Sequence, residues 1–323
     1  MGLFDRNSKK SAKSKKETEE TQAAETVKEE TTEKEETTEK EETSEKAAES
    51  ENTARPTRYT FLVENVFVVD EGESIAAVGN LHGMINVGDE FFIIHPKFVR
   101  PLVAKADALV VEKEMKDSAQ DCRLAIRITD ITDPNEIPKY SVISNIEPQL
   151  TPQPNRPIEN PLLVGLTCEY NRLVKENEFT YTFMVSLLTA NYITPADMEL
   201  EEPDPTTGKV KLKDPKVSFR LLHHPNDNNL LVLPLFTDIA ALGLWTAIQR
   251  ENENGEKPKT VLMPFERCAD IGLKNGGVVI NPFGPFPVFV SNQNLQNTLM
   301  LREQAIKRQR NQAAGGSSNT NFD

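Results

Sequence analysis

The chain has 323 residues, 37% of them hydrophobic, and a formal net charge of −13 at pH 7. This apolar content supports two ordinary domain cores and excludes a wholly disordered protein. Residues 17–51 hold fifteen Glu and four Lys, residues 1–16 are basic, and the remainder carries a net charge of −7. An ordered part with this charge lacks the broad basic field of a general nucleic-acid binder.

Residues 1–56 are predicted to form a disordered acidic low-complexity tail. They consist largely of Lys, Glu, Thr, Ser and Ala, with the near repeat EETTEK, EETTEK, EETSEK between Glu29 and Lys46. Such a composition cannot offset the conformational entropy lost on ordering. We interpret the tail as a solvated spacer that adds reach and solubility. A specific acidic docking role, and contact of the basic head with anionic lipid or RNA, are the alternatives.

Short strands are predicted from residue 57 onward. Runs rich in Val, Ile, Phe and Thr alternate there with glycines and charged turns, which is typical of an antiparallel sheet. In RLAIRIT at 123–129 the Leu and Ile residues fall on one face. FFII at 91–94 is apolar on both faces and indicates a strand covered on each side. About six such runs in about 90 residues favour closure into a barrel.

Gly83 and Gly88 lie in HGMINVGDE, where tight turns require a residue without a side chain. With Gly79 and Asp89 they form a barrel turn motif that resembles the second domain of elongation factor Tu and its relatives. The resemblance implies a translation-factor domain 2-like β-barrel over residues 57–146. In that family the barrel supports contacts with ribosomal RNA or the aminoacyl end of transfer RNA, but its turns carry arginines where this chain has acidic and neutral residues. The matching positions are Phe61, Val63, Val66, Phe67, Gly79, Gly83, Ile85, Val87, Gly88 and Asp89.

A proline-rich linker is predicted at residues 147–159. Five prolines lie between Asn145 and Pro161, a density that excludes helix and central strand. Because prolines favour extended polyproline II, we expect the linker to hold two domains apart semi-rigidly.

Beyond the linker the apolar residues return at helical spacing. They predict one helix over 162–174 and a second over 179–188. The segments LLVLPLFTDIAALGLW, TVLMPFERCADIGLKNGGVVINPF and PVFVS then alternate strands with helices, which predicts an α+β or α/β sandwich. Asp238, or Thr237 before it, can cap the helix that runs to Trp245.

These segments, in this order, resemble the N-terminal domain of the SseB family. The match lies in the LPLFTD turn before a helix ending in Trp, the MPF start of the next helix and the GGVVINP strand. It implies an SseB-like α+β domain over residues 160–294, with a binding or regulatory role and no established catalytic residues. Residues 199–217, which contain DPTTGK, are predicted to be a surface insertion. Residues 295–323 are predicted to be a basic C-terminal helix and a flexible tail; we interpret the helix as a solvated end, with a partner contact as the alternative.

The sequence contains no established catalytic motif. No GxxxxGK[ST] phosphate loop is present, which excludes GTP hydrolysis by that motif. His223 and His224 are adjacent, so on a strand they point to opposite faces. Glu266 and Asp270 lie one helical turn apart and are interpreted as an exposed helical face. We therefore predict no enzyme, no catalytic residue, no cofactor and no metal; His82 and His95 are placed in barrel turns.

The loop NPFGPFP offers a candidate recognition surface. It combines two Phe with three Pro, which would hold aromatic rings in fixed positions. Exposed rigid aromatics are efficient anchors for a protein partner, whereas packing in the core or at a turn is the other interpretation. The possible partner-binding residues are Asn281, Pro282, Phe283 and Phe286.

The predicted fold class is α+β multidomain: a small antiparallel β-barrel, then an SseB-like α/β domain, with a disordered N-terminal tail. The predicted function is non-catalytic binding or regulation through an unidentified protein partner. RNA or ribosome association through the barrel is the alternative function. The cysteines, Cys122, Cys168 and Cys268, lie far apart without metal spacing and are typical of reduced thiols in a cytoplasmic protein. No stretch approaches the roughly 18 apolar residues of a membrane span.

Overall fold

The computed structural model describes residues 58–151, 153, 156–201, 212–214, 216–224, 227–256 and 258–315, and side chains as far as residue 311. The predicted tail at 1–56, the DPTTGK turn and residues 316–323 lie outside these ranges. Within them, no helix combines the length and apolar character needed to cross a membrane.

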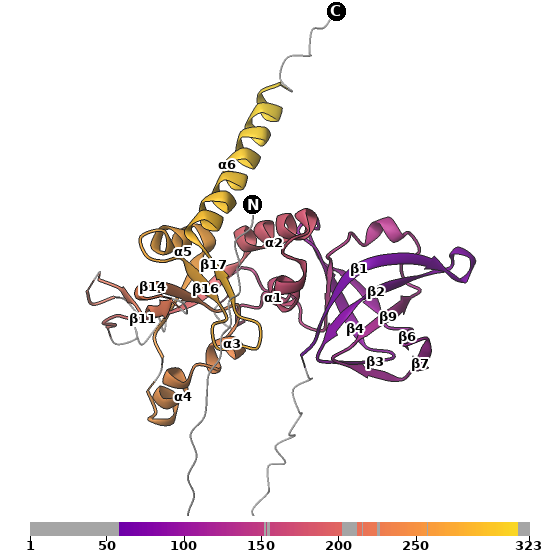
Figure 1. Cartoon of the computed structure of the whole chain (residues 1–323), viewed down its shortest axis with the longest axis horizontal. Helices are drawn as coiled ribbons and strands as arrows, with labels where there is room; N and C mark the ends of the chain where they lie inside the picture. The colour runs from indigo at the N-terminus through magenta and orange to yellow at the C-terminus, as the bar shows by residue number, and fades with distance from the viewer. Residues whose placement is uncertain are drawn as a thin grey trace, which may run out of the picture. The chain divides into compact units, whose positions relative to one another are not determined.

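The first part of the described chain is an antiparallel, barrel-like sheet (Figure 1). Eight strands follow the order β5-β4-β10-β1-β2-β9-β6-β7, and β3 pairs with β8. Backbone bonds from Gly88 N to Ala106 O (2.7 Å) and from Ala106 N to Asp89 O (3.0 Å) join segments outside the ladders. The strands are β1 (Thr60–Val69), β2 (Ser74–His82), β3 (Met84–Asn86), β4 (Glu90–Ile94), β5 (Leu102–Lys105), β6 (Ala108–Val111), β7 (Glu114–Lys116), β8 (Ser118–Gln120), β9 (Arg123–Ile128) and β10 (Val142–Ser144).

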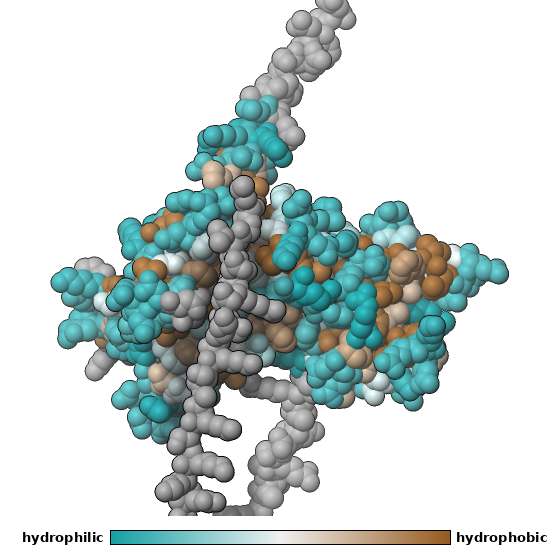
Figure 2. Space-filling view, viewed as in Figure 1, coloured by the Kyte–Doolittle hydropathy of each residue, from teal (hydrophilic) through white to brown (hydrophobic). Residues whose placement is uncertain are grey.

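The alternation predicted for 123–129 is confirmed in β9. Leu124, Ile126 and Ile128 are buried in the barrel core, whereas the residues between them are partly or fully exposed. The burial of β1 changes along its length: its first four residues are buried, but Phe67 and Val68 near its end are exposed. Figure 2 shows hydrophobic surface over this end of the barrel strands.

The second part of the described chain mixes helices with two small sheets. One sheet has the order β13-β14-β16-β17, with β14 parallel to β16, and the other has the order β12-β11-β15. The elements are α1 (Pro161–Leu173), α2 (Asn177–Thr189), β11 (Asn191–Asp197), β12 (Ser218–Phe219), β13 (Leu222–His224), β14 (Asp227–Leu235), α3 (Ile239–Gly243), α4 (Thr246–Glu253), β15 (Thr260–Pro264), α5 (Phe265–Gly272), β16 (Val278–Ile280), β17 (Val288–Val290) and α6 (Asn292–Gly315).

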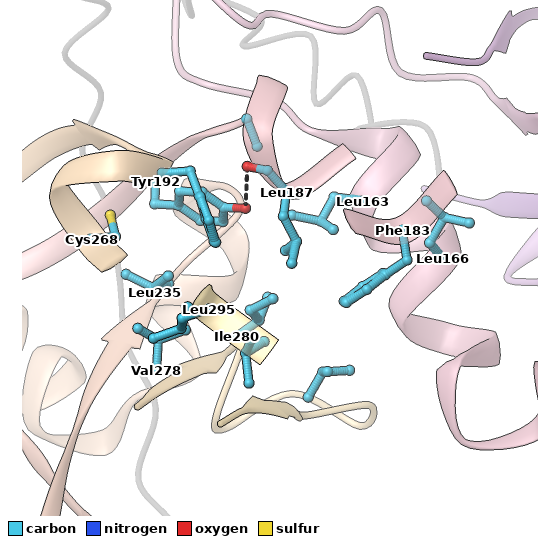
Figure 3. Packing of buried hydrophobic residues seen from close by; sticks show 14 of the residues in the cluster. Leu163, Leu166, Phe183, Leu187, Tyr192, Leu235, Cys268, Val278, Ile280 and Leu295 are labelled. Carbon is cyan, nitrogen blue, oxygen red and sulfur yellow. Dashed lines mark hydrogen bonds between the residues drawn. The ribbon is translucent and has the colours of Figure 1, made fainter. Parts of the chain in front are cut away.

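The core of this part forms where helices cover the parallel pair of strands. Side chains of α1 and α2 meet those of β14, β16 and α5, as Figure 3 shows for the buried cluster. Tyr192, which is fully buried, donates its hydroxyl to the carbonyl oxygen of Leu187 at 3.1 Å. The two helices predicted over 162–174 and 179–188 are thus present, and both contribute their apolar faces to this cluster.

The prediction that residues 147–159 form an extended spacer is wrong. Gln149 and Glu159 form an antiparallel bridge, with Gln149 N donating to Glu159 O at 2.9 Å and Glu159 N donating to Gln149 O at 3.3 Å. Gln153 and Arg156 form a second bridge inside it. These two bridges place described residues from the two ends of the segment side by side.

The barrel and the mixed part share a core instead of standing apart. Leu62, Tyr140 and Val142 of the barrel belong to the same buried cluster as the α1 and α2 side chains. α1 lies especially close: a Cβ atom placed on Gly165 would be 2.7 Å and 2.8 Å from the two methyl carbons of Val142. Gly165 therefore lets the helix backbone approach β10.

Replacing Gly165 with alanine tests this packing. In an unpacked helix the change should stabilise the chain by about 1 kcal/mol, because alanine is the better helix former. Here we expect a net loss of about 1–2 kcal/mol, since Val142 is stiff and cannot move aside. Urea unfolding measures the difference. In a Val142→Ala background the same change should become stabilising; a Gly165→Ala gain in the wild-type background would contradict the shared core.

Candidate functional site

A cavity of about 580 Å³ opens where the barrel meets the mixed part. Its wall is mostly apolar and comes from the start of β1, the end of β2, the first half of α1, α3, and the loop between β16 and β17. Its size and character match the pockets that hold ligands or partner side chains in other proteins. Representative wall residues are Thr60, Gly83, Val164, Ala241, Leu244 and Phe286.

The floor of the pocket is the N-terminal half of α1. Pro161 occupies the first turn of that helix, where its missing N–H costs no hydrogen bond. Val164, Thr167 and Cys168 follow on the side that lines the cavity. Burial raises the pKa of the Cys168 thiol to about 12, so it stays protonated at neutral pH and is a poor nucleophile.

Charged side chains line the pocket, with Arg58 half-exposed and Glu159 and Asp238 largely buried. The Arg58 guanidinium donates to both carboxylate oxygens of Glu159, at 2.9 Å and 2.5 Å, and lies 3.5 Å from Asp238. Asp238 also accepts from Ala241 N at 2.8 Å and caps α3, as the sequence predicts. The predicted helix up to Trp245 is shorter than expected: α3 ends at Gly243, and a separate helix, α4, begins at Thr246.

Next to the pocket, Glu169 of α1 binds the barrel. It accepts from His82 Nε2 at 2.7 Å, from Asn80 Nδ2 at 3.2 Å and from Arg172 Nε at 2.6 Å. Burial raises the pKa of this carboxyl, but the bonds from His82, Arg172 and Asn80 outweigh burial and bring it down to about 2. Arg172 also pairs with Glu64 of β1. The prediction that His82 lies in a barrel turn is wrong, because His82 is the last residue of β2.

The loop NPFGPFP borders the same pocket. Phe286 lies against His82, with 4.9 Å between ring centroids and an edge-on arrangement. Phe283 is 38% exposed and stacks on Trp245 at 5.1 Å. Trp245 in turn stacks on the fully buried Phe236 at 6.1 Å, so the aromatic rings form a column from the core to the surface.

The other predicted loop residues support this arrangement. Asn281 is buried, has a φ of +46°, accepts from Thr237 N at 3.1 Å and donates to Thr237 Oγ1 at 2.9 Å. Asparagine tolerates the left-handed region better than most residues. Pro282 is half-buried beside it. Asn281 thus holds the loop, while Phe283 and Phe286 face the surface and the pocket.

The four residues of the barrel turn motif do not all lie in turns. Gly83 and Gly88 have φ values of +96° and +88°, as the turn prediction requires, and Asp89 accepts from Asn86 N at 2.8 Å. Gly79 instead lies inside β2, so its assignment to a turn is wrong. Its lack of a side chain allows the carbonyl oxygen of Leu62 to come close.

The histidine and carboxylate pairs do not converge on one site. His223 contacts the backbone oxygen of Asn228 at 2.9 Å, and the His224 ring packs edge-on against Phe289 at 4.6 Å. Glu266 pairs with Arg302 at 2.8 Å. Across the part of the chain that the structure covers, no group of three or more His, Cys, Asp or Glu side chains is arranged to hold a metal.

His95, Cys168 and Cys268 are uncharged at neutral pH because of their burial. Burial, together with Lys97, lowers the pKa of His95 to about 4, so its ring is neutral at pH 7. Cys122, Cys168 and Cys268 are all free thiols. Burial raises the pKa of Cys268 to about 12, as it does for Cys168.

Sequence reasoning missed the barrel side of the pocket. Arg58 and Glu159 are 101 residues apart, and His82 and Glu169 are 87 apart. No local pattern links residues at such separations. The one available signal was Gly165, a glycine in the interior of a predicted helix, which often marks a close approach of another element.

Residues 171–297 match the family model described as the SseB protein N-terminal domain. Most of α1, which carries the floor of the pocket, precedes the matched range. The comparison with curated proteins gives no match.

Several solved structures of translation factors are similar to this chain. Elongation factor SelB from Methanococcus maripaludis, in complex with the GTP analogue GppNHp, is 17% identical with a TM-score of 0.25, over 28% of this chain and 19% of that one. Its apo form is 8% identical with a TM-score of 0.27, over 65% and 36%. A bacterial selenocysteine-specific elongation factor, EF-Sec, is 13% identical with a TM-score of 0.26, over 57% and 26%. The chain thus spans about a third or less of the length of these factors.

Proposed function

We propose that this chain, which carries an SseB N-terminal domain, is a non-catalytic binding or regulatory protein that associates with another protein through the pocket beside α3. The observation that carries the proposal is the open apolar cavity of about 580 Å³ with Phe286 in its wall. A pocket of this kind accepts a large side chain of a partner, which loses contact with water on binding.

The surface around the pocket supports a protein partner. Ile239 of α3 and Leu244, the residue that follows this helix, are 54% and 48% exposed. Phe283 is 38% exposed and belongs to the same loop as the wall residue Phe286. The column of rings behind Phe283 holds it in one orientation, so little side-chain entropy is lost on contact. Exposed apolar side chains around a pocket are typical of a protein interaction site.

The chemistry of the site also favours binding over catalysis. The acids and bases of the wall already have partners: Glu159 and Asp238 pair with Arg58, His82 pairs with Glu169, and Asp121 accepts from Gly83 N. The only thiol in the wall, among residues with described side chains, is protonated at neutral pH. We place this activity in the cytoplasm, consistent with the free cysteines.

Affinity capture with the full chain tests the proposal. Partners recovered by the wild type should decrease at least about tenfold with the Phe283→Ala plus Phe286→Ala variant, because anchor aromatics contribute most of the energy of such contacts. Phe67→Ala is the control, since Phe67 is an aromatic side chain on the barrel that is even more exposed than Phe283 and does not line the pocket. Quantitative mass spectrometry measures the recovery.

Two results would count against the proposal. Unchanged capture by the double variant, with loss of capture by Phe67→Ala, would move the interaction to the barrel. Ribosomal material recovered only at low salt would favour RNA or ribosome association, because phosphate contacts weaken as salt rises.

A further inference from the structure

We infer that the pocket takes a partner segment in which a bulky apolar side chain stands next to a lysine or arginine. This inference rests on the proposed function and adds the chemistry of the partner. It follows from two features of the same site, the apolar wall of the cavity and the charged side chains that line it.

The described wall of the cavity holds more carboxylate side chains than Arg and Lys side chains. Glu159, Asp238 and Asp121 line the cavity, and Arg58 is the one Arg or Lys side chain in its described wall. Arg58 is shared, at 2.5 Å from Glu159 and 3.5 Å from Asp238, so it compensates one carboxylate and not two. His82 is likewise shared: it contacts Glu169 at 2.7 Å, and its effect on the pKa of Asp121 is the smallest of the causes that lower it.

Asp121 stands apart from this pair and binds only uncharged donors among the described contacts. It accepts from Gly83 N at 2.7 Å and from Gln120 Nε2 at 3.2 Å. The bond from the Gly83 amide is the main cause that lowers the pKa of Asp121, so the carboxylate is ionised at neutral pH. The cavity wall therefore carries an excess of negative charge, and Asp121 is the carboxylate of the three that is exposed.

This combination selects the occupant. An apolar side chain fills the cavity, and a neighbouring cation reaches the exposed carboxylate of Asp121, where it gains charge-assisted hydrogen bonds. An acidic segment would instead meet like charge, which opposes binding. Ile239 and Phe283 add exposed apolar surface outside the cavity wall, which suits a peptide segment because it needs more contact surface than a small amine.

The experiment selects peptides from a displayed random library on the full chain and sequences the binders. We expect enrichment of Lys or Arg directly beside Phe, Leu or Trp. A synthetic peptide with the selected pair should bind at least about tenfold more tightly than the same peptide with Glu in place of the cation. Fluorescence anisotropy gives both dissociation constants.

Variants of the protein assign the effect to the carboxylates of the cavity wall. Asp121→Asn and Glu159→Gln should each reduce the preference for the basic peptide several-fold. Asp130→Asn removes an equal charge from an exposed position outside the pocket and should leave the preference unchanged. Asp121→Lys should bind the Glu peptide better than the wild type does, which keeps the test valid if one variant folds poorly.

The outcomes separate the two proposals. Peptides that bind through Phe286 with no preference between Arg and Glu would overturn the charge inference and leave the pocket as the binding site. Binders that are unaffected by Phe283→Ala plus Phe286→Ala would overturn both. Selection of acidic or purely polar peptides would also overturn the inference.

Discussion

Gly79→Ala should destabilise the chain by about 4 kcal/mol or more, or prevent folding, which places it among the most damaging single substitutions. A Cβ atom at this position would lie 1.8 Å from the carbonyl oxygen of Leu62 and 2.8 Å from its carbonyl carbon. Both atoms belong to the backbone of β1, which is paired on both sides, so neither can move without breaking the ladder. Equilibrium unfolding in urea, or the soluble yield if folding fails, measures the effect.

Gly72→Ala is the control for this prediction. Gly72 has a φ of +101°, yet no atom lies within 4 Å of the position of an added Cβ. Alanine there should cost only the strain of a left-handed backbone, about 1 kcal/mol. Equal losses of stability in the two variants would show that the close approach of Leu62 to Gly79 is not the cause of the destabilisation.

Glu169→Gln should lower the free energy of unfolding by about 2 kcal/mol at neutral pH, because the buried carboxylate holds Asn80 and His82 of the barrel and Arg172 of its own helix. Glutamine keeps the size of the side chain but removes its charge. The loss should be visible in urea unfolding monitored at the single tryptophan. Glu303→Gln, at an exposed position of α6, should change the stability by less than about 0.5 kcal/mol.

The lowered pKa of Glu169 predicts how the stability of the chain depends on pH. The folded-state pKa of Glu169, about 2, is below its ordinary value of 4.5, so protonation favours the unfolded chain. The stability that Glu169 provides is therefore complete above about pH 4.5 and is lost as the pH falls toward 2. In Glu169→Gln this contribution to the acid slope should disappear. An unchanged slope between pH 4.5 and 2 would contradict the ion-pair network.

Local patterns were sufficient for most of the elements. The alternation in β9 depends only on which face of one strand is apolar, and the spacing in α1 and α2 depends only on one face of each helix. Asp238 caps α3 through its own nearby backbone. Gly83 and Gly88 have the positive φ that their turns require. In each case the cause lies within a few residues of the effect.

The candidate site could be predicted only in part. Phe283 and Phe286 were chosen from a rigid aromatic loop, and the structure places Phe286 in the pocket wall and Phe283 on the column of rings. Their role as partner anchors stays a prediction, as does the absence of catalysis. The opposite wall of the pocket, with Arg58 and His82, had no sequence signal because it depends on contacts across 87 to 101 residues.

The sequence by itself determined the order of the parts: strands closing a barrel, then helices and strands matching an SseB N-terminal domain at 171–297. Only the tertiary structure decided that these parts share a core, because the proline density of the linker favours extension locally. Three tertiary features reverse that local preference. They are the backbone bonds between Gln149 and Glu159, the close approach of Gly165 to Val142, and the ion pairs of Glu169. The pocket exists because of this packing, since its walls come from both parts and neither forms it alone.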